Sequence, residues 1–446
     1  MPNLKKLGLS ILGIVAVAAI YYFTSGSQQL TLKMKEQIDA EIATLQTQGF
    51  SIEGREVSET KEHFVLSFND TKKIAKLLNE NGAQINAEDA EVLKGLKVGV
   101  DIAYLEDVYS SATFDIYPLA LPTLVTTASY DKEEKALLSQ VEKMLEKKTF
   151  LVHISINKLG TGFKGYMKDI NEVLTAEKNV TLTLKDLKFN GDLKNNKTSS
   201  VTQTLSEIRM QVEDDLDMHL NGLTSHYTLT GKTNYDYTTD YTMDNVSVVA
   251  PSEFTLALEE TTVTSKSSTK DGLVSVSMTS ASKNFTLDSN GEKLKLKRIA
   301  FDMNIDNLDI KAIQGLEQAN SKNEKEMNAL LQQLISKSVR LEIPTFSVEN
   351  IIYNDQELNN FAITADMDID KSLNLTTLEQ NPMAAIDAIN ANLNMTLSSE
   401  LFGILSQQPQ AMMAMMLFQP KDVNGKKVYK VELKDGKLLV NDQPVM

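Results

Sequence analysis

The stretch FDMNIDNLDI, residues 301–310, alternates apolar and polar residues with a period of two. Successive side chains of a β-strand point to opposite faces, so this spacing predicts a strand with one buried and one solvated face. The same alternation recurs in residues 180–189, 215–223, 254–263, 273–278 and 361–370. Repeated one-sided strands are typical of an antiparallel sheet.

Amphipathic helices are expected between the strands. Residues 131–145 and 323–337 carry apolar side chains at helical spacing, and Asp131 can cap the first of these helices with Glu134 at the capping-box position. Near the end of the chain, Asp435-Gly436 joins two alternating runs and predicts a hairpin. The predicted fold is α+β and β-dominated: a large, curved, half-barrel-like antiparallel sheet flanked by amphipathic helices.

The composition narrows the function classes. The chain has 446 residues, a formal net charge of −15 and no cysteine. An acidic chain is a poor partner for nucleic acid, because phosphate binding needs clustered lysine and arginine. The lack of cysteine excludes disulfides, a thiolate nucleophile and cysteine-ligated metals.

The N-terminus predicts a membrane anchor. Residues 1–6 form a cytoplasmic stub with two lysines, and residues 24–30 are a polar linker. Residues 7–23 are uncharged, and their length is at the low end of what spans a bilayer. Residues 31–446 are then a periplasmic β-rich domain. The proposed anchor residues are Leu7, Leu9, Ile11, Leu12, Ile14, Val15, Val17, Ile20, Tyr21, Tyr22 and Phe23. The alternative is a signal peptide cleaved after the small-x-small pattern at residues 16–18.

The chemistry-bearing residues form no recognisable catalytic pattern. Asp215, Asp217 and His219 lie at period two and could share a metal, but a solvated strand face is the favoured interpretation. The acidic runs at 302–306 and 366–370 have the spacing of the first calcium-loop ligands, yet lack the glycine and glutamate that such a loop needs. We therefore expect no catalytic residues, no cofactor and no metal.

A methionine-rich segment, PQAMMAMMLFQP at residues 409–420, stands out in a polar chain. It is too short to span a bilayer, and it follows a similar apolar segment at residues 400–405. A plug in the core beneath the last strands is the favoured interpretation, with an apolar groove or a self-association surface as the alternative. The groove residues would be Leu401, Phe402, Leu405, Met412, Met413, Met415, Met416 and Phe418.

Three segments carry a resemblance to a known family. They are the N-terminal run with LQTQGFSIEGREVSETKEHFVLSF, the strand-to-helix segment FDMNIDNLDIKAIQGL, and the ending VNGKKVYKVELKDGKLLVNDQPV. Together they resemble the YdgA-like proteins of the bacterial inner membrane. The resemblance implies a single-pass anchor, a periplasmic domain and self-association, and it supplies no catalytic residues. Asn441-Asp442 stands where the family usually ends in Asn-Gly.

A weaker likeness, in MKEQIDAEIATL and the alternating strands, is to half-open β-barrel surface lipoproteins. The lipid-bearing cysteine of those proteins is absent. The expected function is therefore a non-enzymatic, membrane-anchored envelope protein that binds or scaffolds along an apolar sheet face, with a lipid or other apolar ligand. The alternatives are an exported adhesin-like module and an envelope hydrolase.

Overall fold

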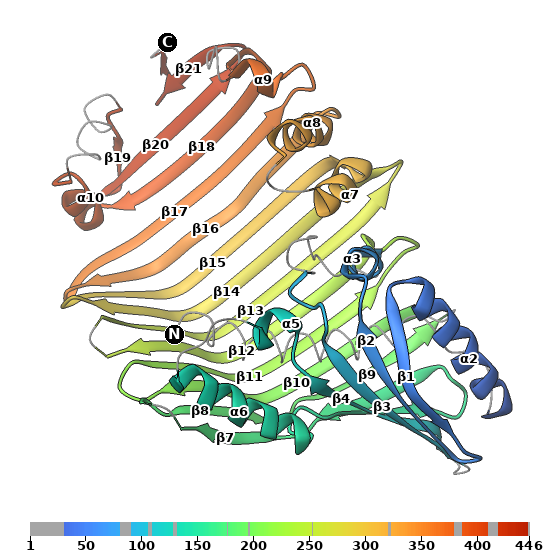
Figure 1. The fold of residues 1–446 in the computed structure, drawn as a ribbon. Helices are drawn as coiled ribbons and strands as arrows, with labels where there is room; N and C mark the ends of the chain where they lie inside the picture. Colours follow the sequence, from blue (N-terminus) through green and yellow to red (C-terminus); the bar gives the residue numbers. More distant parts are fainter. Residues whose placement is uncertain are drawn as a thin grey trace. The chain divides into compact units, whose positions relative to one another are not determined.

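A computed structural model describes residues 31–80, 91–105, 109–127, 132–175, 177–194, 197–251, 253–319, 323–378, 386–408 and 418–444. It is β-dominated, with extensive antiparallel sheet and a few helices (Figure 1). The chain divides into two compact units, unit 1 (Met1–Leu229) and unit 2 (Thr230–Met446). The predicted anchor at 7–23 lies outside the described residues. Within the described part, no helix combines the length and apolarity that crossing a membrane requires.

Unit 1 is an antiparallel meander, in which each strand pairs with strands close to it in the chain (Figure 1). Its strands are β1 (Phe50–Val57), β2 (Lys61–Phe68), β3 (Lys97–Tyr104), β4 (Ser110–Ala120), β5 (Val152–Asn157), β6 (Gly162–Met167), β7 (Ile170–Leu174), β8 (Val180–Lys185), β9 (Lys188–Lys194), β10 (Lys197–Val212) and β11 (Leu216–Leu229). Its helices are α2 (Thr31–Thr47), α3 (Thr71–Glu80), α5 (Thr123–Thr126) and α6 (Lys132–Glu146).

The alternating run at 180–189 forms two strands instead of one. β8 pairs with β7 and with the second half of β10, whereas β9 pairs with β6 and with the first half of β10. The break falls where Asp186 adopts a φ of 53°. A positive φ is rare for a residue with a side chain and interrupts the extended backbone. The alternation predicted the strand faces, and it could not show this interruption.

Unit 1 buries its apolar sheet face. One cluster joins 32 buried residues, most of which come from β1–β8, from β10 and from helices α2, α3 and α6. In α2, Ile38, Ile42 and Leu45 lie at helical spacing and are all buried. In α6, Leu137 and Val141 are buried in the same cluster. Helices of unit 1 thus cover the apolar side of the strands, as a one-sided sheet requires.

Unit 2 is also a meander, built from longer strands (Figure 1). Its strands are β12 (Tyr237–Ala250), β13 (Phe254–Lys270), β14 (Leu273–Ser289), β15 (Glu292–Asp309), β16 (Val339–Tyr353), β17 (Gln356–Ile369), β18 (Ile389–Ser398), β19 (Lys421–Val423), β20 (Lys426–Lys434), β21 (Lys437–Val440) and β22 (Gln443–Pro444). Its helices are α7 (Ile310–Gln318), α8 (Glu324–Leu334), α9 (Leu375–Leu378) and α10 (Ser399–Leu405).

Several sequence predictions are confirmed in unit 2. The run at 301–310 is the second half of β15, which ends where the Asp309 side chain accepts hydrogen bonds from the backbone of Lys311 and Ala312 and so caps α7. The predicted hairpin joins β20 and β21 through Asp435 and Gly436, with φ values of 49° and 75°.

The predicted helix at 323–337 forms as α8, but its packing differs from the prediction. Asn323 caps it by accepting a hydrogen bond from the Glu326 backbone. Its apolar stripe was expected to point into a core, yet none of its described residues is fully buried and Leu331 is 36% exposed. This prediction was wrong because unit 2 provides little enclosed interior for the stripe.

Candidate functional site

The register of unit 2 brings side chains from seven strands into one row, and all of them except Ser280 are apolar or aromatic. From β13 to β20 the directly paired residues are Val263, Ser280, Phe301, Phe346, Ile363, Met395 and Tyr429. At roughly 4.8 Å per strand the row is about 29 Å long. We call it the central row.

Two parallel rows flank it on the same side of the strands. One runs through Val276, Ile305, Leu341, Met367, Ala391 and Leu433. The other runs through Ser282, Ile299, Val348, Phe361, Leu397 and Lys427. These three rows define the apolar face of unit 2.

Most side chains of this face are only half-buried. Phe301, Phe346, Ile363 and Met395 all keep part of their surface in contact with solvent. The buried cluster of unit 2 has three members, Val348, Ile351 and Leu358. A continuous apolar surface that stays partly in contact with solvent is a candidate binding surface.

Aromatic contacts fix the middle of the face. The rings of Phe301 and Phe346 meet edge to face with centroids 5.8 Å apart, and those of Phe346 and Phe361 do so at 5.0 Å. Such cross-strand pairs stabilise a sheet by roughly 0.2–1 kcal/mol each without an overlying layer. The face is therefore held in shape by its own lateral contacts.

The opposite face of the same strands is polar and internally paired. Arg340 pairs with Glu342 at 2.7 Å, and the Asn392 amide donates to Asp366 at 2.9 Å. The side chains of the two calcium-like runs, at 302–306 and 366–370, alternate onto this face. The alternation of the sequence thus separates a charged face from an apolar one, as predicted.

Helices cover the ends of the strands in unit 2. Leu401 and Ile404 of α10 pack on the Val348–Ile351–Leu358 cluster at one end. Figure 1 shows α7 and α8 at the opposite end of the strands. The described side chains in the middle of the central row keep part of their surface in contact with solvent.

The predicted groove residues are only partly placed. Leu401 contacts the buried cluster, Phe402 lies with its ring 5.5 Å from the Lys427 ammonium, and Leu405 and Phe418 are half-buried. Met412, Met413, Met415 and Met416 lie outside the described residues. The prediction missed Phe301, Phe346, Ile363 and Met395, although Phe301 and Ile363 belong to the alternating runs at 301–310 and 361–370.

Tyr429 closes the central row. Its side chain is 5% exposed, and its hydroxyl has no hydrogen-bond partner among the described residues. Burial raises the pKa of this phenol, so it stays a neutral donor at ordinary pH. A buried, unpaired hydroxyl at the end of an apolar row can hydrogen-bond the polar end of a ligand.

The residues considered for a metal are otherwise engaged. Asp217 binds Arg209 through two hydrogen bonds of 2.8 and 2.5 Å, and the His219 Nε2 lies 3.2 Å from a Glu207 carboxylate oxygen. The Arg209 hydrogen bonds hold the pKa of the Asp217 carboxyl below its usual range. Over the described ranges, no group of histidine, aspartate and glutamate has the arrangement of a metal site.

Comparison with known proteins gives no information on the family or the function of this chain. No family model matches the chain, and neither a curated protein nor a solved structure matches it.

Proposed function

We propose that this protein is a non-enzymatic binding protein whose unit 2 holds the acyl chain of a lipid along its apolar face. The observation that carries the proposal is the central row, in which the half-buried apolar side chains of Phe301, Phe346, Ile363 and Met395 follow one another across four paired strands. A surface of this kind is stabilised when an apolar ligand removes it from water.

The dimensions of the face favour an acyl chain. The central row is about 29 Å long, and the hydrocarbon core of a bilayer, two acyl chains thick, is about 30 Å. One row therefore has room for a complete acyl chain. Methionines at 278, 303, 367 and 395 add unbranched side chains that adapt to a flexible ligand.

The ends of the row fit an amphipathic molecule. At one end the Tyr429 hydroxyl offers a hydrogen bond, whereas the nearby Lys427 ammonium is already paired with Asp422. The middle of the row carries no charged residue. A ligand with one long apolar part and one polar end matches this distribution better than a wholly apolar one.

The N-terminal run supports the same proposal. An uncleaved anchor at 7–23 would keep unit 2 close to a bacterial inner membrane, with the bulk of the chain in the periplasm. The curvature of the sheet and membership of the YdgA-like family belong to this proposal as predictions. Self-association through the apolar face is its main competitor, and an adhesin-like or hydrolytic role has no specific observation in its favour.

Mass spectrometry of organic extracts tests the proposal on full-length protein purified from its membrane in mild detergent. The expected result is enrichment of acyl lipids over an unrelated single-pass protein purified in parallel. In the variant Phe346→Gln the enrichment should fall several-fold, because a polar amide then lies in the middle of the row. Ser347→Gln is the matched control, since the neighbouring side chain points to the opposite face.

Two results would count against the proposal. One is lipid recovery equal to that of the unrelated protein. The other is an equal loss in the two variants, which would show that recovery depends on the fold and not on the apolar face. A dimer that dissociates in Phe346→Gln, without any lipid enrichment, would favour self-association.

A further inference from the structure

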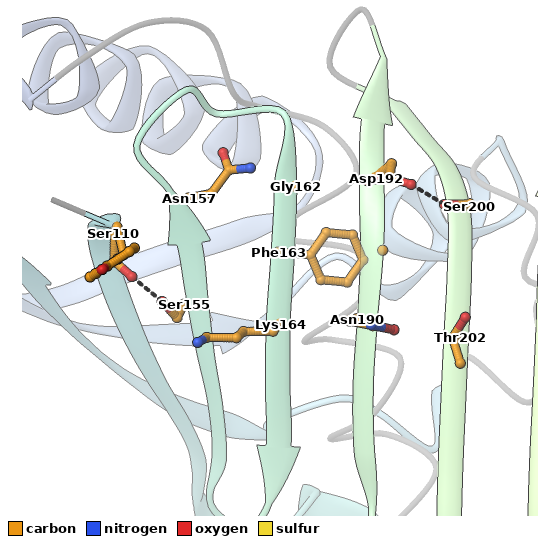
Figure 2. Close-up of a pocket in the computed structure, with 12 residues that line it drawn as sticks. Ser110, Ser155, Asn157, Gly162, Phe163, Lys164, Asn190, Asp192, Ser200 and Thr202 are labelled. Atoms are coloured by element: carbon orange, nitrogen blue, oxygen red, sulfur yellow. Dashed lines mark hydrogen bonds between the residues drawn. The ribbon is translucent and has the colours of Figure 1, made fainter.

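A second surface lies in unit 1, on the side of the strands that faces away from its core. Figure 2 shows a trough across β5, β6, β9 and β10. It consists of two adjoining hollows with volumes of about 370 and 480 Å³. Ser155, Lys164, Asn190 and Thr202 line both hollows, so the two form one continuous groove. Volumes of this size are typical of small-molecule sites.

The strand register explains the lining. Ser155, Lys164, Asn190 and Thr202 are consecutive partners in one row across the four strands. A neighbouring row contains His153, Tyr166, Lys188 and Thr204, and on the other side Asp192 pairs with both Gly162 and Ser200. The groove is therefore an ordered array of hydroxyl, amide and charged groups.

Gly162 deepens the groove. A Cβ at this position would lie 3.1 Å from the Asn157 amide nitrogen and 3.2 Å from the Gly191 carbonyl oxygen. Gly165 and Gly191 face the other way, where the rings of Phe189 and Phe163 cover them on the core side. The rings of Phe189 and Phe163 therefore fill the core side of the strands beneath the groove. On the groove side, Gly162 has no side chain, which leaves space for a ligand.

Several polar groups in the groove have no hydrogen-bond or ion-pair partner among the described residues. Among the described residues, the Asn190 amide and the Lys164 ammonium make no hydrogen bond or ion pair, and the Tyr166 hydroxyl makes none either. Figure 2 shows Lys164 extending from β6 toward Ser155. By contrast, Ser155 is bonded to Ser110 at 2.9 Å. The free donors and acceptors therefore lie in the centre of the groove, available to a ligand.

Aromatic rings stand at both ends. Tyr166 is 45% exposed and stacks on the ring of His153 with centroids 5.1 Å apart. His153 is in turn held by Asp115 at 2.7 Å, which fixes the orientation of the pair. Tyr109, which lines the other hollow, is 82% exposed. Exposed tyrosines of this kind offer an apolar ring face with a polar tip.

From this arrangement we infer that the groove of unit 1 binds a saccharide. A sugar ring presents hydroxyls around its rim and C–H groups on its faces. The rim matches the row of Asn190, Lys164 and Thr202, and the faces match the rings of Tyr166 and Tyr109. A short oligosaccharide fills both hollows, with one ring at each tyrosine.

Other ligand classes fit less well. An anion such as phosphate requires several convergent cations or a helix N-terminus, but Lys188 is paired with Asp186 at 2.7 Å and Asp192 adds a negative charge. A peptide strand requires an open sheet edge, and β6 and β9 are paired on both sides. An acyl chain would leave the amide and ammonium groups of the floor without partners.

Isothermal titration calorimetry on the purified full-length protein tests the inference. The probes are maltotriose, cellotriose and chitotriose, with inorganic phosphate as the competing probe. We expect saturable binding of at least one trisaccharide. Asn190→Ala and Tyr166→Ala should each weaken that binding about tenfold, whereas Tyr166→Phe, which keeps the ring, should weaken it about threefold or less.

Asn171→Ala on β7 is the matched control, because Asn171 is exposed on unit 1 and does not line the groove. It should bind as the unchanged chain does. Binding of phosphate alone, binding of none of the trisaccharides, or an equal loss in Asn171→Ala and Asn190→Ala would each overturn the inference. The lipid-binding proposal for unit 2 is unaffected by all of these results.

Discussion

Units 1 and 2 are both meanders of strands with one apolar face, but they differ in how much of that face is buried. In unit 1, helices and strands enclose 32 buried residues in one cluster. In unit 2, the corresponding cluster has three members and the central row remains half-buried. The same alternating sequence pattern thus produces a sealed core in one unit and an accessible face in the other.

The difference lies in the connections between the strands. Unit 1 places α2, α3 and α6 where their apolar residues enter the cluster. Unit 2 places α10 at one end of its strands, and α8 keeps its stripe partly in solvent. A sheet without a second layer must stabilise itself through cross-strand pairs, and its free face is available for a ligand.

Core truncation should show the largest contrast. Phe64 in unit 1 is fully buried, so Phe64→Ala should lower the free energy of unfolding by about 3–5 kcal/mol. Phe346→Ala in unit 2 removes a half-exposed ring and should cost about 1–2 kcal/mol. Urea denaturation of both variants checks this. Equal losses would mean that the face of unit 2 is packed like a core.

A buried ion pair should give the next largest effect. The Glu62 carboxylate, with its side chain 1% exposed, accepts hydrogen bonds from Arg55 at 2.7 Å and Tyr104 at 2.8 Å. Arg55→Met leaves that charge buried and should destabilise unit 1 by about 2–3 kcal/mol. Arg298→Met removes an exposed partner of Glu349 in unit 2, and should change stability by less than about 0.5 kcal/mol. Denaturation midpoints of the two variants distinguish these cases, and a comparable loss in both would contradict the contrast.

Unit 2 should show an acid-dependent loss of stability at Asp236. Burial alone would raise the pKa of this carboxyl, but hydrogen bonds from Thr233 and Thr269 outweigh burial and lower it to about 2. A folded-state pKa below the ordinary value contributes stability that is present above about pH 4. That contribution is lost as the pH falls toward 2.

Thermal melts of the unchanged chain and Asp236→Asn test this at neutral pH and near pH 2. The variant should melt at a lower temperature than the unchanged chain at neutral pH, and this difference in melting temperature should be smaller near pH 2. An equal difference at both pH values would show that the carboxylate charge does not stabilise the turn before β12.

The smallest difference in stability between two paired variants is expected on β17. Ile363→Gln and its neighbour Ala362→Gln lie on opposite faces of β17, and both should change the free energy of unfolding by no more than about 1 kcal/mol. Only Ile363→Gln should weaken binding of a fluorescent fatty acid. Fluorescence titration of both variants measures this. Equal affinity of the two variants for the fatty acid would show that the central row is not part of the lipid-binding site.

The sequence predicted the strand faces and the final hairpin because both depend on local spacing. It also predicted the apolar stripe of α6, in which Leu137 and Val141 are buried. It could not show that Phe301, Phe346, Ile363 and Met395 form one row, since that depends on register across strands far apart in the chain. The saccharide groove was missed for the same reason. Its lysine, asparagine and tyrosine look like ordinary outward-facing residues until three strand pairings bring them together.

The most direct test of the contrast between the units is photocrosslinking of the full chain with a diazirine-bearing fatty acid, followed by peptide mapping. The account predicts adducts on the central row, at Phe301, Phe346, Ile363 or Met395, and none within the buried cluster of unit 1. Adducts confined to unit 1, or no adducts above those of a heat-denatured sample, would contradict it.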